Sequence, residues 1–90
     1  MDLDNSGRFL KDLKLAKRRW LDLSQLKNVT DMLQAGKKLI EQFRDHSLTG
    51  NYKDYRECHI SSDWLLIYRK KETIRVISLY HMGTHSDLFR

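Results

Sequence analysis

Four histidines occur in the 90-residue chain, and all of them lie in its second half: His46, His59, His81 and His85. They fall where the sequence pattern predicts that strands end or turns begin, at the rim of a sheet that a substrate can reach. An imidazole has an ordinary pKa of about 6.5, so it can accept or donate a proton near neutral pH. Taken singly, each histidine is more typical of an ordinary surface or core side chain. Together they are the candidates for acid–base chemistry.

Metal binding is a weaker interpretation of the same residues. His81 and His85 are separated by three residues, and Cys58 directly precedes His59. Structural zinc sites draw their ligands from closely spaced Cys and His pairs, and no such pattern occurs here. We therefore expect no metal and no cofactor. Cys58 is the single cysteine, so it cannot form an internal disulfide, and its strand-like surroundings predict a buried thiol in a reducing cytoplasm.

The composition indicates one folded domain over residues 1–90. Apolar residues make up 40% of the chain and aromatic residues 10%, which argues against disorder. No apolar run approaches the roughly 20 residues that span a bilayer, and the N-terminus lacks the basic and apolar segments of a signal peptide. We expect a cytoplasmic protein without a membrane partner.

The N-terminal part predicts a short edge strand followed by a basic helix, which Asn5 or Ser6 can cap. The apolar side of this helix has the spacing of one helical face and comprises Phe9, Leu13, Ala16 and Trp20. The other side carries a basic stripe formed by Lys11, Lys14, Lys17, Arg18 and Arg19. With a net charge of +5, such a stripe favours nucleic acid or an acidic protein segment as a partner, although it is also typical of a solvated helix surface.

A second helix is predicted to begin at Asp22 and to end before Gly36, because glycine readily adopts the left-handed backbone found at helix C-termini. Its apolar side comprises Leu26, Val29 and Leu33. The short connection predicts that the two helices form an antiparallel hairpin. Residues 37–51 are expected to be a loop that is held to the core by Leu39, Ile40 and Phe43.

Three strand-like segments follow, at about 52–60, 64–71 and 73–81. The middle segment is apolar on both faces, which is typical of a central strand. The links between the segments are short and therefore predict an antiparallel meander. The predicted fold class is α+β, with an N-terminal strand and a two-helix hairpin packed on a small, mainly antiparallel sheet.

Four sequence blocks in this half resemble a known family: Asp45-His46-x-Leu48-x-Gly50, Tyr55-Arg56-Glu57-Cys58-His59-Ile60, Asp63-Trp64-Leu65-Leu66-Ile67-Tyr68 and Gly83-Thr84-His85-Ser86-x-Leu88-Phe89. Their order and spacing are similar to those of the YafQ branch of the RelE/ParE superfamily, toxins of bacterial type II toxin–antitoxin systems. The order of the predicted elements extends the resemblance over nearly the whole chain. It implies a RelE-like fold.

The resemblance also implies a function. Such a toxin is an endoribonuclease that enters the ribosomal A site, cuts the mRNA presented there and halts translation, until a DinJ-like antitoxin binds and silences it. The catalytic positions of the family fall on His46, His59, Asp63 and His85. Its terminal aromatic residue falls on Phe89. One position departs from the family pattern, because His81 stands where YafQ-like toxins have an arginine.

This reaction needs no metal, because RNA carries its own nucleophile, the 2′-hydroxyl. His46 and His59 are candidates for the base that removes its proton, and His85 is the candidate for the acid that protonates the leaving 5′-oxygen. Asp63 would orient an imidazole. The supporting positions are His81, Lys53 and Phe89. An imidazole at position 81 is charged only part of the time, so we expect slower or more pH-dependent cleavage than with arginine.

Two other interpretations stay open at this point. In the first, the scaffold is a ParE-like toxin that acts on DNA gyrase, for which no catalytic histidines are needed. In the second, it is an RNA-binding module that does not cut. If the partner is the ribosome and its mRNA, the basic stripe would speed docking, and an acidic antitoxin segment could bind the same surface.

Overall fold

The computed structural model describes residues 1–88, and Phe89 therefore lies outside the described part of the chain. The elements are, in order, β1 (Asp2–Asn5), α1 (Gly7–Arg18), α2 (Leu23–Gln34), β2 (His46–Ser47), β3 (Arg56–Ser61), β4 (Trp64–Lys71), β5 (Val76–Gly83) and α3 (His85–Leu88). Short 3-10 turns lie at Glu41–Phe43 and Gly50–Tyr52. Within residues 1–88, no helix is long and apolar enough to cross a membrane.

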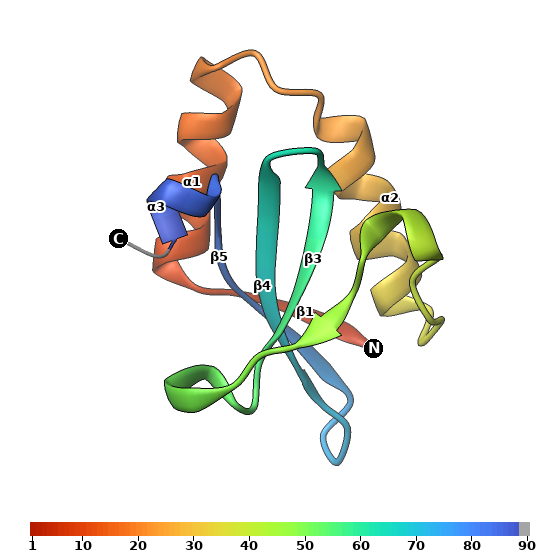
Figure 1. The fold of residues 1–90 in the computed structure, drawn as a ribbon. Helices are drawn as coiled ribbons and strands as arrows, with labels where there is room; N and C mark the ends of the chain where they lie inside the picture. Colours follow the sequence, from red (N-terminus) through yellow and green to blue (C-terminus); the bar gives the residue numbers. More distant parts are fainter. Residues whose placement is uncertain (89–90) are drawn as a thin grey trace.

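The five strands form one sheet in the order β1-β5-β4-β3-β2 (Figure 1). β1 is parallel to β5, and the other three pairs are antiparallel. β4 is thus the central strand, as its two apolar faces predict. The predicted α+β fold with a mainly antiparallel sheet and an edge strand at the N-terminus is confirmed.

The start of α1 is fixed to the middle of β5 by polar contacts. The Ser6 hydroxyl accepts a hydrogen bond from the Phe9 amide at 3.0 Å, which caps the helix, and it donates one to the Tyr80 carbonyl at 2.6 Å. Phe9 and Ala16 are buried, as the helical spacing predicts. The helix therefore covers the part of β5 that extends beyond β1.

Trp20 does not belong to the buried face of α1, and this prediction is wrong. The helix ends at Arg18, Arg19 is its C-terminal cap, and Trp20 is 92% exposed with a left-handed φ of 57°. The Trp20 amide donates to the Lys17 carbonyl, and the Leu21 amide donates to the Ala16 carbonyl. These two bonds form a Schellman motif that reverses the chain, so the i, i+4 spacing has no meaning beyond Arg18.

α2 begins and ends where its sequence signals predict. The Asp22 carboxylate accepts hydrogen bonds from the Ser24 hydroxyl at 2.5 Å and from the Ser24 amide at 2.9 Å, and these bonds, the first above all, hold the pKa of Asp22 below its usual range. Gly36 has a φ of 73° and ends the helix in a second Schellman motif. α1 and α2 run in opposite directions, as in the predicted hairpin (Figure 1). They are splayed, however, so that α1 packs on β5 and α2 packs on β3.

The expected loop at 37–51 contains a strand that the sequence pattern did not indicate. β2 has only two residues, His46 and Ser47, which pair with Glu57 and Arg56 of β3. A strand this short has no periodicity to detect. Phe43 is buried as expected, whereas Ile40 is 51% exposed, so its predicted role in the core is wrong.

The sheet has a helical face under α1 and α2 and an opposite face, which we call the open face. The helical face carries the main core, in which Trp64 and Tyr68 are buried with Cys58. Burial raises the pKa of the Cys58 thiol, so it stays protonated. On the open face a smaller cluster of Leu65, Ile67 and Leu88 is flanked by Leu48, Tyr55 and Tyr80.

Candidate active site

His46 and Glu57 form the polar centre of the open face. They are directly opposite each other in the β2–β3 pair, and His46 Nε2 lies 3.4 Å from Glu57 Oε1. His46 Nδ1 lies 2.8 Å from the Arg44 carbonyl oxygen. Both neighbouring oxygens are acceptors, so the two contacts are satisfied together only when both ring nitrogens carry a proton.

Asp45 holds this segment to the sheet. Its carboxylate accepts hydrogen bonds from the Arg56 guanidinium at 3.0 to 3.3 Å and from the Tyr68 hydroxyl. Arg56 also donates to the Ser47 hydroxyl at 3.2 Å. The hydrogen bonds to Asp45 raise the pKa of Arg56. Burial, and then the hydrogen bond from its own hydroxyl to Asp45, raise the pKa of Tyr68. Asp45 thus fixes the backbone from which His46 projects.

His59 lies on β3 two residues after Glu57, so both side chains are on the same face. It is the diagonal neighbour of His46 across the β2–β3 pair, and such neighbours have backbones roughly 7–8 Å apart. No residue in the described range 1–88 is hydrogen-bonded to its ring. It borders a hollow of about 370 Å³ that Arg44, Gln25 and Gln42 also line.

Asp63 and His85 lie at the same end of the sheet. Asp63 precedes β4, His85 follows β5, and these strands are antiparallel neighbours in which Leu65 is opposite Gly83. Both side chains are exposed. His59 is itself opposite Leu65, so it is two strands away from Gly83 along one row of the sheet. The structure thus places His59, Asp63 and His85 near one end of the sheet, with His46 beside His59.

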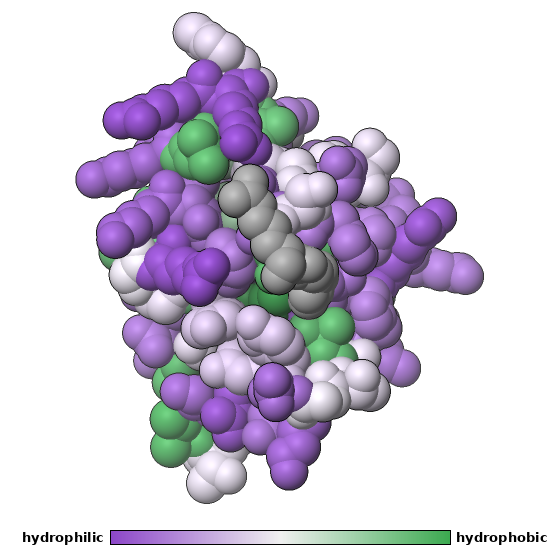
Figure 2. Space-filling view, turned by 60° about the vertical axis from the view of Figure 1, so that its left-hand side comes forward, coloured by the Kyte–Doolittle hydropathy of each residue, from purple (hydrophilic) through white to green (hydrophobic). Residues whose placement is uncertain are grey.

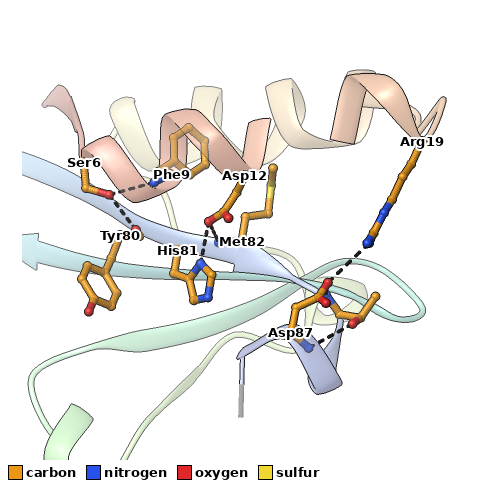
Figure 3. Close-up of polar contacts among 9 residues, drawn as sticks. Ser6, Phe9, Asp12, Arg19, Tyr80, His81, Met82 and Asp87 are labelled. Carbon is orange, nitrogen blue, oxygen red and sulfur yellow. Dashed lines mark hydrogen bonds and ion pairs between the residues drawn. The ribbon is translucent and has the colours of Figure 1, made fainter. Parts of the chain in front are cut away.

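α3 is attached to this end by a reciprocal cap. The Thr84 amide donates to Asp87 at 3.0 Å, and the Asp87 amide donates to the Thr84 hydroxyl at 3.2 Å. The bond from the Thr84 backbone, with help from Arg19, holds the pKa of Asp87 below its usual range. Arg19 Nη1 lies 3.4 Å from Asp87 Oδ2 (Figure 3). The Arg19 guanidinium also lies 5.9 Å from the centre of the Trp64 ring. The C-terminal end of α1 is therefore next to α3.

His81 is 6% exposed and faces Asp12 of α1 rather than open solvent. Its Nδ1 donates to Asp12 Oδ2 at 2.5 Å, and the same carboxylate oxygen accepts the Met82 amide at 2.9 Å (Figure 3). Within the described residues, His81 Nε2 has no hydrogen-bond partner. His81 shares a cross-strand row with Ile67, Glu57 and His46, three strand spacings or about 14 Å from His46.

The remaining candidates are separate from the histidines. Lys53 lines another hollow together with Asp45 and Arg56. The members of the basic stripe are exposed, namely Lys11, Lys14, Lys17, Arg18 and Arg19. Figure 2 shows long hydrophilic side chains projecting from the side of the molecule that carries α1 and α3. Across residues 1–88, no group of three or more His, Cys, Asp or Glu side chains is arranged to hold a metal.

Comparison with known proteins decides the family. The family model for YafQ, a bacterial toxin of type II toxin–antitoxin systems, matches residues 1–90. The mRNA interferase toxin YafQ of Escherichia coli is 38% identical over 89 residues, which cover 98% of this chain and 95% of that protein. The chain belongs to the YafQ family.

Solved structures of YafQ agree with this assignment. The crystal structure of YafQ from Escherichia coli superposes with a TM-score of 0.92 at 34% identity and covers 99% of this chain and 98% of that chain. The Escherichia coli DinJ–YafQ toxin–antitoxin complex contains a chain that superposes with a TM-score of 0.89 at 36% identity, covering 99% and 97%. The fold predicted from the resemblance is therefore confirmed as that of a YafQ toxin.

Three residues of the site in this YafQ family member were not among the sequence candidates: Asp12, Asp45 and Glu57. Glu57 had a detectable signal, because it alternates with His59 on one strand. Asp45 directly precedes His46 in one of the blocks that resemble the family. Asp12 had no signal in the sequence, because its contact with His81 joins residues 69 positions apart and depends on the packing of α1 against β5.

Proposed function

We propose that this chain is an mRNA interferase toxin: a ribosome-dependent endoribonuclease that cleaves mRNA in the A site and is neutralised by a cognate antitoxin. The observation that carries the proposal is the full-length similarity to a protein named mRNA interferase toxin YafQ. The polar groups of the open face support it, because they supply acid–base groups beside one another on the rim of a sheet. A gyrase inhibitor would have no use for them.

Cleavage requires attack of the RNA 2′-oxygen on phosphorus and rupture of the bond from phosphorus to the 5′-oxygen. The base takes the proton of the 2′-hydroxyl, and the acid gives a proton to the leaving 5′-oxygen. Cationic donors stabilise the additional negative charge on the phosphorane. All three tasks can be performed by imidazole and guanidinium groups.

We assign the base role to His59 and a cationic role to His46. His59 has an open ring and borders a hollow, whereas both nitrogens of His46 are next to acceptors. Because each ring nitrogen of His46 faces an acceptor oxygen, His46 is less suited to be the base and is proposed to stabilise the phosphorane as a cation. Arg44, which lines the same hollow as His59, would add a permanent positive charge.

His85 is the acid in this proposal, and Asp63 is its neighbour at the same end of the sheet. The exposed position of His85 lets it reach the leaving oxygen of a bound RNA strand. His81, buried against Asp12, would not transfer a proton itself, and a positive charge at its position would help to stabilise the phosphorane. Phe89 follows Leu88 and is proposed to stack on a nucleotide.

The proposed partners are mRNA on the ribosome and an antitoxin of the DinJ kind. The Escherichia coli relative is found in a complex with DinJ. On this chain the basic stripe offers a surface for an acidic antitoxin segment or for ribosomal RNA. Because both ligands would use the same charges, antitoxin binding would also block docking on the ribosome.

Primer extension on mRNA in a translating extract tests the proposal. We expect new mRNA ends with the wild type and at least a hundredfold fewer with His85→Ala, because loss of a general acid typically costs roughly 10²–10⁴ in rate. Ser86→Ala, on the same exposed turn of α3, is the matched control and should cut normally. Ends that form equally well without translation would refute the ribosome dependence, and a wild type that makes no ends would refute the nuclease function.

A further inference from the structure

Trp20 is the most exposed large apolar side chain among residues 1–88. It is 92% exposed, compared with 65% for Ile74 and 51% for Ile40. Isolated apolar residues on a surface need no explanation, but a tryptophan exposes far more apolar area than the others.

The backbone at Trp20 makes the choice more unusual. The two long helices end in the same Schellman motif, with Gly36 as the left-handed residue after α2 and Trp20 as the left-handed residue after α1. Glycine is the usual residue at this position, because any other side chain is strained there. A tryptophan at position 20 therefore destabilises the fold relative to glycine and buries nothing in return.

The surroundings of Trp20 are cationic. Lys17 and Arg18 are exposed on the last turn of α1. The nearest carboxylate along the chain, Asp22, is occupied by hydrogen bonds from the amide and hydroxyl of Ser24. The aromatic ring thus stands beside positive charges that no acidic neighbour in this segment neutralises.

The position is also close to the candidate active site. Arg19, the neighbour of Trp20, contacts Trp64, which directly follows Asp63. Arg19 also contacts Asp87, which lies two residues after His85. A strand of RNA that reaches Asp63 and His85 can therefore continue over the end of α1. Figure 3 shows Arg19 spanning the space between α1 and α3.

We propose that Trp20 is a base-stacking contact for the single-stranded RNA that flanks the cleaved phosphodiester, with Lys17 and Arg18 bound to its phosphates. The proposal rests on RNA as the substrate class of the proposed function. The indole ring of Trp20 is not packed against the rest of the protein, and a nucleobase offers a flat surface on which it can stack. The negative phosphates of the RNA would pair with the neighbouring cations. A site for a protein partner would be expected to contain several apolar side chains next to one another. Trp20 is instead a single aromatic ring flanked by the cations Lys17 and Arg18.

Intrinsic fluorescence provides the test, because the chain has two tryptophans and only Trp20 is exposed, Trp64 being 6% exposed. The probe is a 2′-O-methyl oligouridylate of about ten nucleotides, a typical size for single-strand sites, which lacks the nucleophile and cannot be cut. We expect it to quench the exposed tryptophan. The affinities of the variants, which lack this fluorophore, are measured by the anisotropy of the same oligonucleotide carrying a fluorescent label: Trp20→Gly should bind it roughly tenfold more weakly than the wild type, and Trp20→Phe should keep part of the affinity.

The glycine variant separates this role from a structural one. We expect Trp20→Gly to have an unchanged or higher Tm, because glycine relieves the left-handed strain. Ile74→Ala, which shortens the exposed apolar residue in the β4–β5 turn, is the matched control and should bind like the wild type. Equal affinity of Trp20→Gly and wild type for the oligonucleotide would overturn the inference.

Two further outcomes separate RNA binding by Trp20 from antitoxin binding and from mRNA cleavage. If Trp20→Gly binds RNA normally but escapes neutralisation by the antitoxin, the surface belongs to a protein partner and the inference is wrong. If the oligonucleotide quenches Trp20 while no His85-dependent ends form in the translating extract, the RNA contact stands and the proposed nuclease function fails.

Discussion

At the scale of single residues, Glu57 is the least expected group on the open face. Its side chain is buried, yet the structure gives it one ionic partner, His46 at 3.4 Å. A buried carboxylate costs free energy unless it is paired, and replacing such a group by a neutral one often stabilises a fold. A residue that is unfavourable for stability and adjacent to the candidate catalytic histidines is best explained by a task in the reaction.

Glu57→Gln tests this explanation, because glutamine has the same shape without the charge. We expect the single-turnover rate of mRNA cleavage to fall roughly tenfold or more while the Tm stays equal or rises, since His46 loses its ionic partner. Single-turnover cleavage and thermal unfolding provide the two values. Glu72→Gln, at an exposed carboxylate in the β4–β5 turn, is the control. A lower Tm with unchanged cleavage would show that Glu57 is only structural.

Position 81 allows a gain of function to be tested. A guanidinium keeps its charge at every physiological pH, whereas an imidazole loses it on deprotonation. His81→Arg should therefore raise the rate of cleavage at pH 7 by about tenfold, a fraction of what one charge-stabilising donor contributes. The gain should grow toward higher pH, and the pH–rate profile measures it. An unchanged rate at every pH would show that the residue at position 81 has no part in stabilising the phosphorane.

At the scale of elements, the junction between β5 and α3 decides where His85 stands. The Thr84–Asp87 cap closes the turn, and Arg19 ties it to α1. Gly83 leaves no room for a side chain, because a Cβ built there would lie 2.8 Å from Asp87 Cβ. The single hydrogen atom of glycine thus permits α3 to fold back against the end of the strand.

Gly83→Ala should push α3 away from β5 and displace His85. We expect a loss of stability of roughly 1–3 kcal/mol, typical of overpacking, together with a larger loss of cleavage than stability alone explains. Chemical denaturation and mRNA cleavage measure the two effects. Gly7→Ala is the matched control, since a Cβ there meets nothing within 4 Å. If Gly83→Ala cuts mRNA as well as Gly7→Ala, the position of α3 does not matter for the reaction.

At the scale of the whole molecule, charge and chemistry lie on adjoining surfaces. The net charge is +5, and the basic stripe of α1 leads to Arg19, which contacts α3. A field of this sign attracts a polyanion before any specific contact forms, and it does so in a salt-dependent manner. The stripe therefore supplies affinity, while the groups at the end of the sheet supply the reaction.

The triple variant Lys11→Glu, Lys14→Glu, Arg18→Glu tests this division. We expect ribosome binding to weaken by at least tenfold at low salt and its salt dependence to become shallower, because fewer phosphates are neutralised. Cosedimentation with ribosomes at several salt concentrations measures both. The control Lys37→Glu, Lys38→Glu, Arg75→Glu makes the same change in net charge at exposed positions off the stripe. Equal losses in the two variants would mean that only net charge matters.

The sequence alone was sufficient for most of the elements and for the family. Helix signals act over about four residues, so Asp22 and Gly36 marked real helix ends, and Ser6 is the cap of the two candidates, Asn5 and Ser6, that the sequence offered. The two apolar faces of β4 identified the central strand. Local patterns failed where the cause was not local. Trp20 followed the apolar spacing of α1, but the helix ended two residues earlier.

The tertiary structure alone decided which side chains meet. Asp12 reaches His81 across 69 positions and Arg19 reaches Asp87 across 68, because α1 packs along the free part of β5. The β2–β3 register brings His46 opposite Glu57, and a two-residue strand has no sequence period that could reveal it. Contacts between distant segments depend on register and packing angle, which no local pattern encodes.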